Sequence, residues 1–307
     1  MLRKALLRTI LVFVAFVIVP GASAQNTILG ALEDVPGVYA GEQDVRRVRV
    51  LFHKDGDNWS AFPSDCADGN CLKTVTSRFP HVIAWNIGFD GRTLGRVTAQ
   101  TPDDFKFYAH VGQQDITSKT SIPTIGKKSA AFGGFTGEPV FRPIIANSEP
   151  FFEDPDGWKP ADLPTVLVAT LRRSFRERFP KVKNCTSPEE NIARPWAYED
   201  RNLELIKAYS SKSGWSLAEL VLKEYRCDGP SENPEESDDP FDGQWFVVNP
   251  ERHMRFLGQA MWLVDAGDYD NDGKSEVVFA IDGYDRGGYE LFYDDFNKHV
   301  SFAFSYH

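Results

Sequence analysis

The sequence predicts a mainly β fold, and three observations support that prediction. Most of the chain divides into short segments rich in β-branched and aromatic residues, with Gly, Asp and Asn clusters between them. Several neighbouring segments have the pattern of a hairpin, and a single stretch has the periodicity of an amphipathic helix. The 307 residues are enough for one large β domain or two smaller ones.

Four hairpins are predicted, each from two β-prone segments that flank a polar turn. They pair residues 46–52 with 59–62, 84–89 with 94–97, 203–209 with the segment that starts at Trp215, and 289–293 with 300–304. Trp59 and Trp215 both open a return strand after a turn that contains Gly, which suggests an internal repeat. Tryptophans at such positions are expected to pack in the core.

The single predicted helix covers residues 166–179 and ends before Pro180. Its apolar side chains follow i, i+4 spacing, and they are Leu167, Leu171, Phe175 and Phe179. Arginines dominate the other face. We expect an amphipathic helix that covers a sheet. The alternative is that the arginines form a basic docking surface.

The N-terminus has the three parts of a secretory signal peptide. A basic start is followed by an apolar run over residues 10–19 and by the small-residue cleavage motif Ala22-Ser23-Ala24. The predicted division is a signal peptide at 1–24 and an exported β-rich domain at 25–307, with a possible sub-boundary near 148–162. The protein is therefore expected to be secreted or periplasmic, without membrane insertion after the signal is removed.

Four cysteines suit an oxidising compartment. Three pairings are possible, and we favour Cys66 with Cys71 and Cys185 with Cys227. A zinc site is the alternative, but the Cys-x4-Cys spacing has no matching second pair.

The formal net charge is −10, and loss of the three basic signal residues takes it to −13. An acidic exported protein is poorly suited to bind nucleic acid or an anionic membrane. Residues 228–243 contain acidic and proline residues but no basic residue, so we expect a solvated loop there.

The segment Asp268-Tyr269-Asp270-Asn271-Asp272-Gly273-Lys274-Ser275-Glu276 carries the strongest chemical signal. Carboxylates stand at loop positions 1, 3, 5 and 9, and Gly stands at position 6. Oxygen ligands at this density suit Ca²⁺, which takes six to eight oxygens in flexible geometry. The predicted ligands are the side chains of Asp268, Asp270, Asp272 and Glu276, the carbonyl of Lys274, and water. The alternative is an acidic hairpin turn that is merely solvated.

The loop is not an EF-hand, because position 12 is Phe279 where that motif needs a bidentate Glu. The flanking residues 260–264 and 277–281 are short, apolar and β-prone, so the loop is expected to join two buried strands.

Residues 260–283, with the Asp268–Glu276 loop followed by Val-Val-Phe, resemble the calcium loop of FG-GAP/VCBS-type repeats. Those repeats form blades of β-propellers in integrin α-chains and in many secreted bacterial proteins. Together with the predicted strands and helix, the resemblance implies a degenerate β-propeller-like domain of few blades with one amphipathic helix. A β-sandwich, or two β-rich halves, is the alternative.

The sequence contains no nucleophile elbow, His-Glu-x-x-His motif or phosphate-binding glycine loop. The preferred hypothesis is a non-catalytic, calcium-binding exported protein that presents a surface to an unidentified protein or glycan. One alternative is a secreted hydrolase with a carboxylate- or His-containing cleft. The other is a structural component of an envelope assembly.

Overall fold

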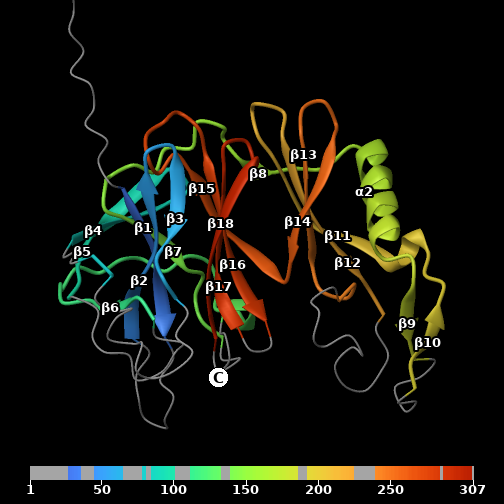
Figure 1. The fold of residues 1–307 in the computed structure, drawn as a ribbon, viewed down its shortest axis with the longest axis horizontal. Coiled ribbons are helices and arrows are strands. Elements are labelled where there is room, and N and C mark those ends of the chain that lie inside the picture. Colours follow the sequence, from blue (N-terminus) through green and yellow to red (C-terminus); the bar gives the residue numbers. More distant parts are fainter. Residues whose placement is uncertain are drawn as a thin grey trace, which may run out of the picture.

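A computed structural model confirms that the fold is mainly β (Figure 1). It describes residues 27–35, 45–64, 78–80, 84–100, 111–132, 139–185, 192–224, 239–283 and 286–305. The predicted signal peptide, Cys66, Cys71, Cys227 and most of the acidic segment 228–243 lie outside these residues. Cys185 lies within them and is disulfide-bonded.

The N-terminal sheet has seven antiparallel strands. Its main path runs β3-β2-β1-β7-β4-β5, and β6 pairs with β2. The strands are β1 (Ile28–Val35), β2 (Val45–Asp55), β3 (Asn58–Ala61), β4 (Ala84–Phe89), β5 (Arg92–Thr98), β6 (Gln113–Asp115) and β7 (Ile144–Asn147). A short 3-10 helix, η2 (Ala130–Phe132), precedes β7.

The rest of the described chain forms two larger sheets and a two-stranded ribbon. The five-stranded sheet, ordered β14-β13-β12-β11-β8, contains β8 (Lys159–Pro160), β11 (Leu203–Ser210), β12 (Ser216–Leu222), β13 (Gln244–Val248) and β14 (Met254–Gln259). The C-terminal sheet is the meander β15 (Met261–Gly267), β16 (Glu276–Gly283), β17 (Arg286–Tyr293) and β18 (Lys298–Ser305). The ribbon pairs β9 (Val182–Asn184) with β10 (Arg194–Trp196), and η4 (Asp200–Asn202) precedes β11.

The C-terminal sheet lies between the other two, with an apolar core on each face (Figure 1). Val278 and Ala280 of β16 belong to the core shared with the N-terminal sheet. Val277 and Phe279, on the opposite face, pack in the core shared with the five-stranded sheet. A strand covered on both sides needs apolar residues at every position, which explains the unbroken apolar run at 277–281.

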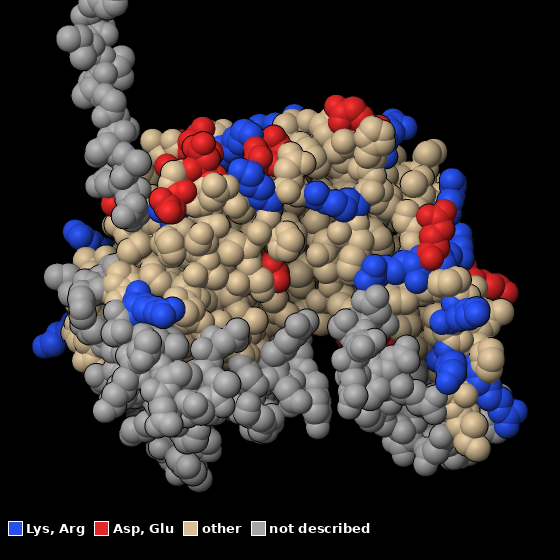
Figure 2. All heavy atoms as spheres, in the orientation of Figure 1, with Lys and Arg blue, Asp and Glu red and all other residues tan. Residues whose placement is uncertain are grey.

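Helix α2 (Thr165–Arg178) covers the outer face of the five-stranded sheet, as predicted. Leu171 and Phe175 are buried in a third core with Ala218 and Leu220 of β12. Figure 2 shows Lys and Arg side chains gathered at the end of the molecule where α2 lies. No helix among the described residues is both long and apolar enough to cross a membrane.

The four predicted hairpins are confirmed as β2–β3, β4–β5, β11–β12 and β17–β18. Trp59 is buried in the core beneath the N-terminal sheet, as expected. Trp215 is partly buried and packs on Phe296, with ring centroids 5.5 Å apart. No closed ring of sheets is formed by the part of the chain that the structure describes.

A substitution at Phe279 tests how much the packing of the C-terminal sheet on the five-stranded sheet stabilises the protein. Its side chain is fully buried, with ring centroids 4.9 Å from Trp245 and 5.7 Å from Phe292. Phe279→Ala should lower the free energy of unfolding by about 3–5 kcal/mol, because it leaves a cavity between two sheets. Denaturant unfolding measures the change. The control Val166→Ala, on the exposed face of α2, should alter it by no more than about 0.5 kcal/mol.

Candidate metal centre

The acidic loop joins β15 to β16, two strands of the doubly covered C-terminal sheet, as the sequence predicted. Its turn uses two residues in the left-handed region, Asn271 with φ +61° and Gly273 with φ +88°. An added Cβ at Gly273 would meet no atom within 4 Å, so the backbone conformation, and not crowding, favours glycine there.

The first carboxylate of the loop, Asp268, shapes the turn. Its two oxygens accept hydrogen bonds from the backbone N–H of Asp272 at 2.9 Å and of Gly273 at 2.8 Å. The last carboxylate, Glu276, accepts one from the N–H of Tyr269 at 2.8 Å. Together these bonds fold the chain around its own acidic side chains. Each carboxylate oxygen keeps a second lone pair for another partner.

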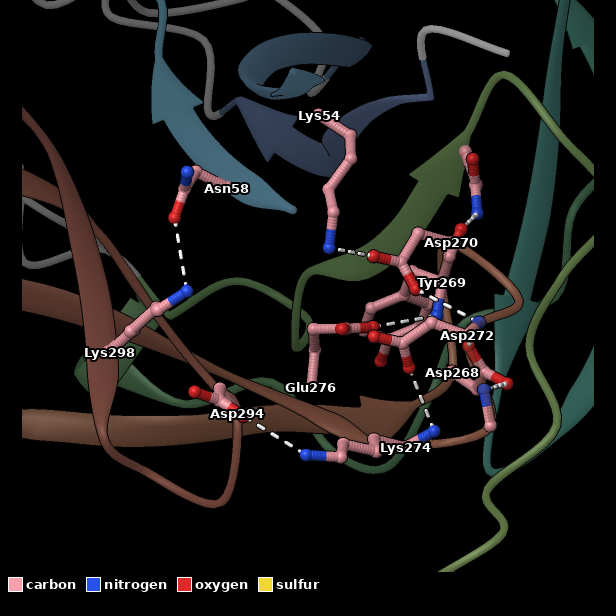
Figure 3. Close-up of polar contacts among 12 residues, drawn as sticks. Lys54, Asn58, Asp268, Tyr269, Asp270, Asp272, Lys274, Glu276, Asp294 and Lys298 are labelled. Atoms are coloured by element: carbon pink, nitrogen blue, oxygen red, sulfur yellow. Dashed lines mark hydrogen bonds and ion pairs between the residues drawn. The ribbon is translucent and has the colours of Figure 1, made fainter. Parts of the chain in front are cut away.

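Asp268, Asp270 and Glu276 converge at one point (Figure 3). One oxygen from each lies within 4.8 Å of the other two. Calcium–oxygen distances of about 2.3–2.6 Å place ligands on opposite sides of one ion about 4.6–5.2 Å apart. The separation of the three oxygens is therefore compatible with contact to a single Ca²⁺. Mg²⁺ demands near-ideal octahedral geometry and keeps several of its waters, so a site built mainly from carboxylates favours Ca²⁺.

The other two predicted ligands are placed differently. The Asp272 side chain is exposed and accepts a hydrogen bond from the N–H of Lys274 at 2.9 Å. The ammonium of Lys274 points away from the cluster, 3.0 Å from Asp294 and 3.4 Å from Asp295 (Figure 3). The carbonyl of Lys274 stays a predicted ligand.

Burial makes the ion-free cluster electrostatically unfavourable. The Glu276 residue is only 1% exposed. Its burial raises the pKa of that carboxyl well above the ordinary value, and the nearby charge of Asp270 raises it further. Burial also raises the pKa of Asp268. Carboxylates in such a position favour either a proton or a cation.

The ammonium of Lys54 lies beside the cluster, and no sequence pattern predicts this contact. Lys54, near the end of β2, donates a hydrogen bond from Nζ to Oδ2 of Asp270. Burial acts to lower the pKa of Lys54, but its hydrogen bond to Asp270 and the negative charges of Asp270 and Glu276 raise it above the ordinary value. The ammonium therefore stays charged beside the cluster.

The N-terminal sheet holds the start of the loop through Asn147 in β7. The Asn147 side-chain amide donates to the carbonyl of Tyr269 at 2.8 Å and to that of Phe151 at 3.1 Å. Nearby, the backbone N–H of Asp268 donates to the carbonyl of Glu153 at 2.6 Å. These bonds fix the loop against the chain that leaves the N-terminal sheet.

The chain between β7 and β8 holds the end of the loop through two more aspartates. The Ser275 hydroxyl donates to Asp154 at 2.6 Å, and the N–H of Ser275 donates to Asp156 at 3.4 Å. Asp156 in turn accepts from the hydroxyl of Ser213, in the β11–β12 turn, at 2.8 Å. Both aspartates come from the stretch 148–162, whose acidic composition we had interpreted only as a possible boundary.

A further buried carboxylate lies in β15. Asp265 accepts hydrogen bonds from the N–H of Asp90 at 3.2 and 3.3 Å. Burial raises its pKa to about 7, although the N–H groups of Ala266 and Asp90 and the charge of Arg142 oppose the change. Among the described residues, Asp265 does not belong to the three-carboxylate cluster.

Comparison with protein-family models, with curated proteins and with solved structures gives no match to this chain. The resemblance of residues 260–283 to an FG-GAP/VCBS calcium loop therefore stays a prediction.

Asp265 gives a pH-dependent prediction. A carboxyl whose pKa rises on folding binds its proton more tightly in the folded state, so stability should fall as pH rises from about 4 to about 7. Asp265→Asn removes this contribution. The variant should exceed the wild type in free energy of unfolding by up to about 4 kcal/mol at pH 8, and the difference should shrink towards pH 4. Denaturant unfolding across this pH range measures it.

The matched control is Asp55→Asn, at an exposed position near the β2–β3 turn. It should not show the same gain at pH 8. An Asp265→Asn variant with a constant stability difference from pH 4 to pH 8 would contradict the assigned burial effect.

Proposed function

We propose that the loop at residues 268–276 binds one Ca²⁺, with Asp268, Asp270 and Glu276 as its primary ligands. The observation that carries this proposal is the convergence of three carboxylate oxygens within 4.8 Å in a largely buried position. The side chain of Asp272, the carbonyl of Lys274 and water would complete the coordination. Six to eight oxygen ligands satisfy Ca²⁺.

The proposed ion has a structural role at the junction of the sheets. The loop is hydrogen-bonded to Asn147 of the N-terminal sheet and, through Asp156, to Ser213 in the turn that joins β11 to β12 of the five-stranded sheet. Neutralising its carboxylates would remove repulsion from the position where these connections meet. The ion would thereby stabilise the packing of both outer sheets on the central one.

The wider function that we propose is that of an exported, propeller-like binding protein without catalytic activity. Three observations support the exported, propeller-like part of this proposal: the signal-like N-terminus, the acidic loop, and antiparallel sheets that pack face to face. Calcium would keep the sheet arrangement rigid in the secreted or periplasmic protein. The rigid surface would then bind a protein or glycan partner.

Glu276→Gln tests the site, because glutamine keeps an acceptor for the N–H of Tyr269 but removes the charge. The predicted mature chain, residues 25–307, should melt at a higher temperature in calcium than in chelator. A Ca²⁺ concentration of 100 times the Kd contributes about 2.7 kcal/mol. Glu276→Gln should lose most of this shift and melt above the wild type in chelator, because a buried carboxylate that Lys54 compensates only in part is gone. Differential scanning calorimetry measures both effects.

The control is Asp294→Asn, which removes a carboxylate that pairs with Lys274 outside the cluster. Its calcium-dependent shift should equal that of the wild type, and Mg²⁺ should give a smaller shift than Ca²⁺ in both. A wild-type melting temperature that is the same in calcium and chelator would overturn the proposed site.

A further inference from the structure

We infer that Lys54 is a tethered competitor for the calcium site, which raises the calcium concentration needed to fill it and keeps the loop folded when no calcium is bound. This inference rests on the proposed function and concerns how the same site is regulated. Lys54 lies in the hairpin β2–β3 of the N-terminal sheet, 216 residues away from Asp270 in sequence.

The ammonium of Lys54 lies directly against one of the proposed calcium ligands. Asp270 uses Oδ1 to accept the N–H of Asp272 at 3.2 Å, and its Oδ2 accepts the hydrogen bond from Lys54. The Asp270 and Lys54 side chains are only 4% and 12% exposed. A calcium ion held by Asp270 would therefore share that carboxylate with an adjacent buried positive charge. Ca²⁺ and an ammonium bound to the same carboxylate repel each other strongly, since little water screens them.

Two aromatic rings near Lys54 offer an alternative position for its ammonium. Its Nζ already lies 5.4 Å from the ring centroid of Trp59 and 5.8 Å from that of Tyr293. Aromatic faces stabilise an ammonium at such distances. Figure 3 shows Lys54 reaching towards Asp270 from the side of the N-terminal sheet, opposite Lys274. A small change of the Lys54 side chain can thus exchange the carboxylate for the rings without leaving the ammonium in an apolar environment.

Lys54 and Ca²⁺ differ in charge and in the number of carboxylates that they can contact. An ammonium supplies one positive charge and three donors, whereas Ca²⁺ supplies two charges and contacts all three carboxylates at once. Lys54 therefore neutralises the cluster only in part, yet its tether makes it always present. Such a competitor shifts the filling of the site to higher calcium concentration without preventing it. The site would respond to calcium over a range set by Lys54.

The experiment compares the wild type with Lys54→Gln, which keeps a polar side chain of similar length but removes the charge. Calcium binding is measured by isothermal titration calorimetry, and the melting temperature is measured in chelator. Lys54→Gln should bind Ca²⁺ at least tenfold more tightly than the wild type. In chelator it should melt at a lower temperature, because its carboxylates have lost their counter-ion.

The matched control is Lys298→Gln. Lys298 also lies near Tyr293, at 5.7 Å, but it donates to Asn58 and not to the cluster (Figure 3). Its calcium affinity should equal that of the wild type, which separates local competition from a general change in protein charge.

The outcomes distinguish this inference from the proposed function. If both proteins bind calcium and Lys54→Gln binds no more tightly, the competitor role is overturned and the calcium site stands. If only Lys54→Gln binds, the competitor role is upheld, and calcium binding by the native protein is overturned. If neither binds, the calcium site is overturned, and the competitor role falls with it.

Discussion

The burial of acidic side chains between stacked sheets is the constraint on which the rest of the structure depends. Glu276 sits where a strand covered on both faces begins, so its carboxylate cannot reach bulk water. Asp268 is held beside it by the turn that its own oxygens organise. Charges buried in this way need compensation. The hydrogen bonds from the loop backbone supply part of it, and the ammonium of Lys54 supplies another part.

The surrounding architecture explains why the loop adopts one conformation. Apolar cores on both faces fix the positions of β15 and β16 and hence the two ends of the loop. Side chains from outside the central sheet then hold each end: Asn147 binds near the start, while Asp154 and Asp156 bind Ser275 near the finish. The loop is thus a point at which both outer sheets are connected. A change in the charge of the loop should therefore alter how both outer sheets pack on the central one.

Local patterns predicted the fold class and most hairpins, because their information lies within a few residues. The apolar run at 277–281 and the turn residues at 268–273 were sufficient to predict two strands joined by an acidic loop. Strand β1 (Ile28–Val35), which pairs with β2, was not predicted. The order of strands in the N-terminal sheet depends on its pairing with β7, more than 100 residues later. Such pairings leave no local signal.

The same reasoning explains which part of the candidate site could be predicted. The three converging carboxylates come from one short segment, so their spacing alone indicated a cation site. Lys54 lies near the end of strand β2, whose composition is ordinary, and only the packing of two sheets brings its ammonium to Asp270. The contact with Lys54 changes the expected attraction of the loop for calcium. A loop considered by itself carries four carboxylates and predicts strong attraction for calcium. In the folded protein a single lysine offsets one of those charges, so the calcium affinity of the proposed site should depend on the packing between sheets as well as on the loop.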